Sequence, residues 1–258
     1  FLSAALELPE RPSGEVGFDA AQLGTMVHEI LKEVYQRAPS TALEDLLTAL
    51  PEVASRVLAR APERLGFRPG PLWQEEGARI RLEVENTLRA LGECSQGWQP
   101  VGLELRFGMG WGGAPPQRVR ASGGGEFLLR GIIDRADRDA AGQVRLIDYK
   151  SGSTAITAAD LLEGRRVQLA LYAWAAEGVL GLGKVVAGFY WHLHLARRSS
   201  LALEGMEGGP GAAMALAAEH AWRAVAGVRQ GAFPPEPRGH ACPDYCRGRE
   251  FCWRYQPK

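Results

Sequence analysis

The sequence predicts an α/β fold, in which helices flank a central β-sheet and a cysteine-bearing segment forms a C-terminal extension. Between about residues 19 and 36, apolar side chains recur with the period of an amphipathic helix, at Leu23, Val27, Ile30 and Val34. From 101 to 107 the apolar side chains instead alternate, as along one face of a strand, at Val101, Leu103, Leu105 and Phe107. Two further segments, 131–135 and 146–152, each predict a strand that carries an acidic residue.

The remaining segments continue the mixture of helices and strands. Two helices are expected near 41–60 and 73–93, and the break between them is marked by Pro62, Pro69 and Pro71. Glycine and proline are frequent from 108 to 125, which predicts a long exposed hairpin loop. Thr157 and Asp160 form a capping-box pattern that opens one helix reaching about residue 178. A strand near 185–195 and a helix near 211–230 follow, without an evident internal repeat.

Length and composition limit the class of protein. A chain of 258 residues can bury a substantial core as one large domain. No apolar run approaches the length of a membrane span, and the start lacks a secretory pattern, so we expect a cytoplasmic protein without membrane association. The chain begins with Phe1 rather than methionine, which predicts a fragment of a longer protein. It contains no G-x-x-x-x-G-K-[ST] loop, so ATP hydrolysis by the usual route is not expected.

The charge balance restricts how the chain can bind nucleic acid. Thirty basic and thirty acidic residues give a formal net charge of zero. A protein that held DNA by bulk electrostatics alone would be clearly basic. Any binding to nucleic acid must then depend on a local groove, a metal or a partner. We expect positive side chains to gather along one groove, with Arg165, Arg166 and the arginines around 118–130 as the candidates.

The two acidic strands predict a metal site. Asp148 and Lys150 project from the same face of one strand, because side chains alternate along it. Asp134 is expected to end the preceding strand, which brings two carboxylates and one ammonium within a few ångströms. Two oxygen donors suit Mg²⁺ or Mn²⁺. A lysine beside the ion can orient or deprotonate water, or stabilise charge on a phosphate. The alternative is a surface hairpin with an ordinary Asp/Lys pair.

Five motifs occur in order along the chain, Gly24-x-x-x-His28, Gly131-x-x-Asp134, Asp148-Tyr149-Lys150, Gln168-x-x-x-Tyr172 and Cys242-x-x-x-Cys246 with Cys252. Together they resemble the PD-(D/E)xK nuclease superfamily over nearly the whole chain. Within it, the sequence is most similar to the nuclease domain of the RecB/AddB helicase–nucleases and their free-standing relatives. This resemblance implies a restriction-endonuclease-like fold with a central mixed β-sheet.

The resemblance also assigns roles to residues of the predicted site. His28, Asp134 and Asp148 would hold a divalent ion, Mg²⁺ or Mn²⁺, with the carbonyl of Tyr149 as a further oxygen ligand. Lys150 would be the catalytic lysine. Each residue type has an ordinary structural role as its alternative, since a histidine on a helix flank is more often structural or exposed.

Further candidates lie outside this set. Gln168 and Tyr172 are one helical turn apart and would contact the DNA backbone or support Lys150, unless they serve only packing. Glu104 is a possible additional acid near the metal, and a solvated strand glutamate is its alternative. His192 and His194 alternate on a predicted strand, but no third ligand is apparent nearby. Two more aspartates are expected to be turn residues, Asp137 and Asp139.

The cysteines predict a separate site. Cys242, Cys246 and Cys252 lie close together near the C-terminus, which suits a metal or cluster better than a disulfide scaffold. The resemblance implies a [4Fe–4S] cluster in the full-length protein, whose fourth cysteine would precede Phe1, so that Phe1 lies near Cys242 and the cluster is incomplete or absent in this fragment. The Cys-x₃-Cys spacing departs from the Cys-x₂-Cys usual in the family. Cys94 is expected to be a surface thiol.

Two domains and one function follow from this interpretation. Residues 1–233 would form the nuclease domain, and residues 234–258 a cysteine-cluster segment packed on it. The resemblance implies a metal-dependent deoxyribonuclease of DNA repair and recombination, an exonuclease that favours single-stranded ends and works with a helicase domain or subunit. The alternatives are a catalytically inactive DNA-binding module of a helicase–nuclease complex and a structural-metal interaction module.

Overall fold

The computed structural model describes residues 16–110, 113–152 and 154–232. By its contacts the chain divides into two units, one of residues Glu15–Trp222 and one of Phe1–Gly14 with Arg223–Lys258. Every strand of the described residues lies in the first unit. Among the described helices, none combines the length and the hydropathy needed to cross a membrane.

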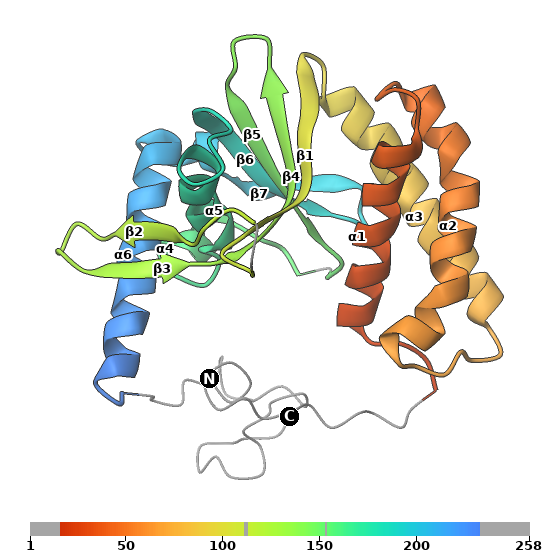
Figure 1. Ribbon diagram of the computed structural model, residues 1–258, viewed down its shortest axis with the longest axis horizontal. Helices are drawn as coiled ribbons and strands as arrows, with labels where there is room; N and C mark the ends of the chain where they lie inside the picture. The colour runs from red at the N-terminus through yellow and green to blue at the C-terminus, as the bar shows by residue number, and fades with distance from the viewer. Residues whose placement is uncertain (1–15, 111–112, 153, 233–258) are drawn as a thin grey trace. The chain divides into compact units, whose positions relative to one another are not determined.

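A mixed five-stranded sheet forms the centre of the first unit, as far as the structure describes it (Figure 1). Across the sheet the strands run in the order β1 (Trp98–Phe107), β4 (Gly131–Asp139), β5 (Val144–Lys150), β6 (Val185–His192) and β7 (Arg197–Ala202). β5 and β6 pair in parallel, and the other neighbours are antiparallel. The predicted α/β class with a mixed sheet is confirmed.

Helices cover both faces of this sheet (Figure 1). The first three pack on one face, α1 (Ala20–Arg37), α2 (Leu43–Leu65) and α3 (Trp73–Cys94). On the other face lie α4 (Ala158–Leu162), α5 (Gln168–Glu177) and the part of α6 (Gly209–Arg229) before residue 223. Side chains of β5 point alternately to the two faces of the sheet. Ile147 therefore joins the core on the first face, and Leu146 joins the core on the second. A strand buried on both faces is mainly apolar, and β5 is buried throughout except at Lys150, with Arg145 as its one charged residue before Asp148.

The β4–β5 hairpin differs from the prediction in where β4 ends. Asp134 does not end this strand, which continues to Asp139, and the turn follows there. The antiparallel register pairs Arg135 with Ile147, so one residue further out Asp134 lies opposite Asp148. Both acids therefore sit at the open end of the hairpin, where β4 begins and β5 ends.

The single helix predicted from Thr157 is two helices. Its start is as predicted, since the backbone N–H of Thr157 donates to Asp160 Oδ2 over 2.8 Å. The break comes at Gly164, whose φ of +76° is accessible to glycine. The backbone N–H groups of Arg165 and Arg166 then both donate to the carbonyl of Asp160, at 2.7 and 3.1 Å. This turn sets the arginines at the start of α5, beside the ends of the central strands.

Three other predicted boundaries were wrong. The segment 108–125 is not one loop, because it contributes β2 (Gln117–Arg120), which pairs with β3 (Glu126–Leu129). The strand expected to reach 195 ends at His192, and β7 follows after a turn. α2 continues past Pro62 to Leu65, one further turn, before Gly66 ends it in the left-handed conformation.

Asp137 is a core residue rather than the predicted turn residue. Its side chain is fully buried and accepts from two arginines, Arg135 Nε at 2.6 Å and Arg145 Nη2 at 2.6 Å. Arg145 also donates to the carbonyl of Cys94 and the hydroxyl of Ser95, each over 3.0 Å. A cation is favoured at the partly negative C-terminus of a helix. The network therefore fixes the end of α3 to the sheet.

Replacing Asp137 by alanine should destabilise the protein by about 3–5 kcal/mol, because it leaves two buried guanidinium groups without their carboxylate. Asp139 is the matched control. It occupies the turn, where its carboxylate accepts from the backbone N–H groups of Ala141 and Gln143, and Asp139→Ala should cost about 1 kcal/mol. Urea unfolding measures both losses, and equal losses would contradict the role of the buried network.

Candidate metal centre and active site

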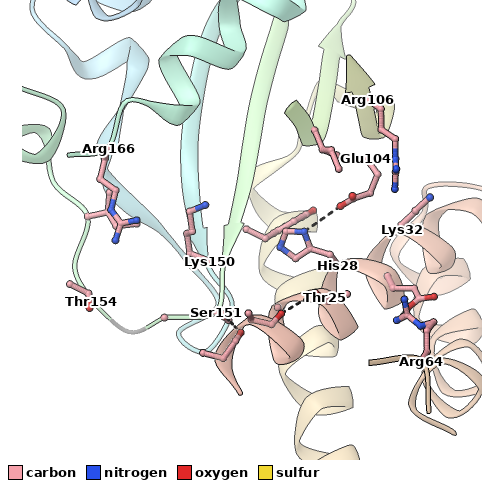
Figure 2. Close-up of a pocket in the computed structure, with 18 residues that line it drawn as sticks. Thr25, His28, Lys32, Arg64, Glu104, Arg106, Lys150, Ser151, Thr154 and Arg166 are labelled. Atoms are coloured by element: carbon pink, nitrogen blue, oxygen red, sulfur yellow. Dashed lines mark hydrogen bonds and ion pairs between the residues drawn. The ribbon is translucent and has the colours of Figure 1, made fainter. Parts of the chain in front are cut away.

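Three side chains from separate elements converge at the open end of the hairpin. They are His28 on α1, Glu104 on β1 and Asp134 on β4, and one ligand atom of each lies within 4.8 Å of the other two. His28 Nδ1 is 3.2 Å from Glu104 Oε1, a contact drawn in Figure 2, and 3.6 Å from Asp134 Oδ1. Donors that surround one ion at about 2.0–2.4 Å lie at comparable separations from one another. Imidazole and carboxylate together suit Mn²⁺, and the carboxylates suit Mg²⁺.

His28 reaches this point because α1 is fixed on the sheet. A capping box starts the helix, in which Asp19 and Gln22 exchange two hydrogen bonds of 2.8 Å. Val27 and its apolar neighbours on the helix are buried in the core of the first face. The imidazole of His28 packs edge-on against the ring of Tyr149, with the ring centroids 5.7 Å apart. Helix packing thereby sets the ring beside the strand ends.

Glu104 joins the site through an unusual backbone conformation. Its φ is +49°, in the left-handed region that residues other than glycine seldom adopt. The pairs Leu103–Arg135 and Leu105–Ile133 on either side place it opposite Asp134. Such a conformation costs on the order of 1–3 kcal/mol and persists where the surroundings enforce it, often at functional sites. The strand alternation alone did not predict this direction for the carboxylate.

Asp148 lies beside this group but is turned to the lysine. The carboxyl is almost fully buried, at 2 % exposure, and its Oδ2 forms an ion pair with Lys150. Its Oδ1 is buried and accepts no hydrogen bond from any residue that the structure describes. A buried carboxylate oxygen without a donor is costly. The chemistry of this oxygen, next to Asp134, fits a divalent cation.

The other carboxylate of the pair is held by the backbone of the motif itself. The N–H of Tyr149 donates to Asp134 Oδ2 over 2.8 Å. This bond leaves Asp134 Oδ1 on the side of His28. The β4–β5 hairpin therefore fixes the orientation of Asp134 through its own backbone.

A chain of hydrogen bonds supports Lys150 from α5. Lys150 Nζ donates to Gln168 Oε1 over 3.1 Å, and the amide of Gln168 donates to the hydroxyl of Tyr172 over 3.2 Å. Tyr172 in turn packs on Gly131, where an added Cβ would lie 2.8 Å from the tyrosine ring and hydroxyl. Glycine at the start of β4 thus admits Tyr172, and the Gln168–Tyr172 pair orients the lysine.

His28, Glu104, Tyr149 and Lys150 line one cleft of about 730 Å³, and Figure 2 shows His28, Glu104 and Lys150 around it. Its lining is rich in charged side chains, namely His28, Glu29, Lys32, Arg64, Glu104, Arg106, Lys150 and Arg166. Small-molecule pockets of this size are lined mainly by apolar and aromatic groups. The cleft instead suits an anionic substrate that approaches a cation.

The acids of the site are poorly disposed to carry charge without a cation. Burial raises the pKa of the Asp134 carboxyl, and the neighbouring Asp148 raises it further, to about 7. Burial also raises the pKa of Asp148, although Lys150 opposes the change. Burial lowers the pKa of His28, but the hydrogen bond to Glu104 and the nearby carboxylates outweigh it and the pKa rises. Protons and a metal ion therefore compete for these side chains.

Other candidates do not join this group. His192 is buried and its Nδ1 lies 3.2 Å from the carbonyl of Gly152, whereas His194 pairs with Glu83 at 3.2 Å. Cys94 carries an exposed thiol at the end of α3. The remaining cysteines lie outside the described residues, at Cys242, Cys246 and Cys252.

Comparison with known families identifies this arrangement. Residues 1–253 match the family model described as the PD-(D/E)XK nuclease superfamily. The chain belongs to that superfamily. Its members use divalent metal ions, in keeping with the acidic group of this nuclease.

The names of this nuclease's relatives confirm the predicted resemblance to helicase–nuclease subunits. A Geobacillus kaustophilus protein, named as one subunit of an ATP-dependent helicase/deoxyribonuclease, is 29 % identical over 215 residues, 75 % of this chain and 18 % of the relative. Proteins of the same name from Symbiobacterium thermophilum and Bacillus licheniformis are 41 % identical over 102 residues and 30 % identical over 218 residues. These cover 37 % and 75 % of this chain, and 9 % and 18 % of the relatives. The chain thus spans less than a fifth of the relatives' length.

Metal affinity of this nuclease should rise with pH through about 7. Asp134 must lose its proton to bind a cation, and its pKa lies at about 7. Below that pH, affinity for Mn²⁺ should fall about tenfold per unit, as measured by calorimetric titration at pH 6, 7 and 8. Glu63→Gln, an exposed change, is the control and should keep this dependence. Equal affinity at pH 6 and pH 8 would contradict the assignment of Asp134.

Proposed function

We propose that this chain is the nuclease domain of an AddB-type helicase–nuclease and hydrolyses phosphodiester bonds of DNA with Mg²⁺ or Mn²⁺. One observation carries the proposal. His28, Glu104 and Asp134 converge beside Asp148, which pairs with a lysine that α5 supports, at a cleft lined by further cations. Superfamily membership supports the chemistry, and the names of the relatives support DNA as the substrate.

The donor set suggests how the work is divided. His28, Glu104 and Asp134 would hold a divalent ion, with Asp148 Oδ1 and the carbonyl of Tyr149 as further oxygen ligands. Such an ion, when bound, lowers the pKa of a coordinated water and offsets the charge of a phosphoryl oxygen. We therefore propose Glu104 as a full member of the ligand set, because its carboxylate lies with His28 and Asp134.

Lys150 would act on the substrate directly. Its ammonium has three N–H donors, of which Asp148 and Gln168 occupy two. The third is available to the scissile phosphate or to the attacking water in the cleft. A fixed donor aimed at developing negative charge stabilises the transition state more than the ground state. Gln168 and Tyr172 are positioning residues in this scheme.

The biological setting follows from the relatives. Their names combine a helicase with a deoxyribonuclease, and we propose that a helicase domain or subunit delivers single-stranded ends to this nuclease in DNA repair. On that proposal the nuclease acts as an exonuclease, which degrades each strand from the end that the helicase delivers. A catalytically inactive DNA-binding module would not require Asp134, Asp148 and Lys150 to be oriented together by hydrogen bonds and an ion pair.

Cleavage of end-labelled single- and double-stranded DNA tests this function. The protein should cleave with Mg²⁺ or Mn²⁺ and not with a chelator. Asp148→Asn and Lys150→Ala should each slow cleavage by about 10²–10³, the usual effect of removing a transition-state contact. Lys184→Ala is the control, because that exposed lysine pairs with Glu177 away from the cleft. Full activity of Asp148→Asn would refute the mechanism, and DNA binding without any cleavage would favour the inactive module.

We also propose that residues 234–258 form a cysteine-cluster segment and that the parent protein holds a [4Fe–4S] cluster there. Three soft thiolates so close in sequence, Cys242, Cys246 and Cys252, select zinc or iron–sulfur. Full-length protein should contain about four iron and four sulfide per chain, and serine at Cys246 should lower both. Stoichiometric zinc without iron would instead support a structural-metal segment.

A further inference from the structure

Many arginines on the described surface are already paired with carboxylates. They are Arg37, Arg56, Arg64, Arg79, Arg89, Arg118, Arg120, Arg165 and Arg198. This pairing changes the predicted set of groove cations, because Arg165 binds Asp160 and the arginines of β2 both bind Glu126. Charges of this kind are largely neutralised by their partners.

Four cations at the active-site end differ from these. Lys32, Arg106, Arg130 and Arg166 lie within ion-pair distance of no carboxylate among the residues that the structure describes. All four line a cleft. Their charges, unlike those of the paired arginines, are therefore available to attract an anionic ligand to the cleft.

Two of them stand on the His28 side of the site. Lys32 follows His28 by four residues, so it lies one helical turn further along the same face of α1. Arg106 follows Glu104 by two residues on β1. Figure 2 shows Lys32 and Arg106 together beyond His28, on the side away from Lys150. We call this pair the α1–β1 grip.

The other two stand on the Lys150 side. Arg166 lines the main cleft and also a second cleft of about 290 Å³, to which Arg130 and Tyr172 contribute. The two clefts therefore adjoin at Arg166. Leu129 and Leu171 give the second cleft apolar walls beside its arginines. Basic side chains combined with apolar and aromatic surface are typical of single-stranded nucleic-acid sites. We call Arg130 and Arg166 the α5 grip.

We propose that the two grips hold one DNA strand on opposite sides of the scissile phosphate. The α1–β1 grip binds phosphates on one side of the metal group, and the α5 grip binds phosphates on the other. The inference rests on the proposed nuclease function and adds the path of the strand. It also gives the turn between α4 and α5 a role, since that turn presents Arg166 to both clefts.

Single methylphosphonate linkages test this path, because each removes one phosphate charge from a defined position in a short single strand. In the wild-type protein, a neutral linkage should suppress cleavage about tenfold at nearby phosphates on both its 5′ and its 3′ side, the cost of one charge-assisted hydrogen bond. Lys32→Ala with Arg106→Ala should lose the suppression on one side. Arg130→Ala with Arg166→Ala should lose it on the other.

The control is Arg60→Ala with Arg81→Ala, which removes two exposed charges from α2 and α3 outside both clefts. It should keep suppression on both sides. Thermal melting checks that each double variant is folded. Loss of the same side in both grip variants, or no change in either, would overturn the proposal.

Binding distinguishes failure of the path from failure of the function. In the Asp148→Asn background with Mg²⁺, each grip variant should lower the slope of log affinity against log salt by about 1.4, the value for two phosphate contacts to a single strand. The control pair should leave the slope unchanged. If the wild type cleaves no DNA but both grips change the slope, the function fails and the path stands. If cleavage is normal and neither grip changes the slope, the path fails alone.

Discussion

The site depends on two buried carboxylates held opposite each other by an antiparallel register. Asp134 and Asp148 repel each other, and burial adds to the cost of their charge. The hairpin tolerates this because its other end is tied by the Asp137 network and its centre is packed on both faces. Protons relieve the repulsion in the absence of a cation, and a divalent cation relieves it better.

The raised pKa of Asp134 makes the stability of the metal-free protein depend on pH. The pKa of Asp134 in the folded protein lies above its ordinary value, so the folded state binds the proton more tightly than the unfolded chain does. The penalty on the metal-free fold therefore builds up as the pH rises from the acid's ordinary pKa near 4, and it is complete above about 7. The left-handed backbone of Glu104 adds a second local cost. A site that binds a cation strongly is destabilised without it, and the surrounding core must offset the difference.

Sequence patterns sufficed for those parts of the site that local rules determine. Alternation placed Asp148 and Lys150 on one face of a strand, and helical spacing placed His28 on the flank of α1. Sequence patterns failed for side chains whose position depends on tertiary structure. The carboxylate of Glu104 depends on a positive φ, and the burial of Asp137 depends on two arginines that meet it only in the folded sheet. The short β2–β3 pair was hidden by a composition typical of loops.

Charge shows the same division between composition and structure. A net charge of zero excludes binding by bulk attraction, but it does not say which charges cancel. In the described part of the chain, carboxylates neutralise many of the arginines on the outer helices and both arginines of β2. They leave Lys32, Arg106, Arg130 and Arg166 around the acids of the metal centre. Cations without an ion-pair partner thus lie around buried acids, an arrangement that favours a phosphate in the cleft and a divalent cation at the acids.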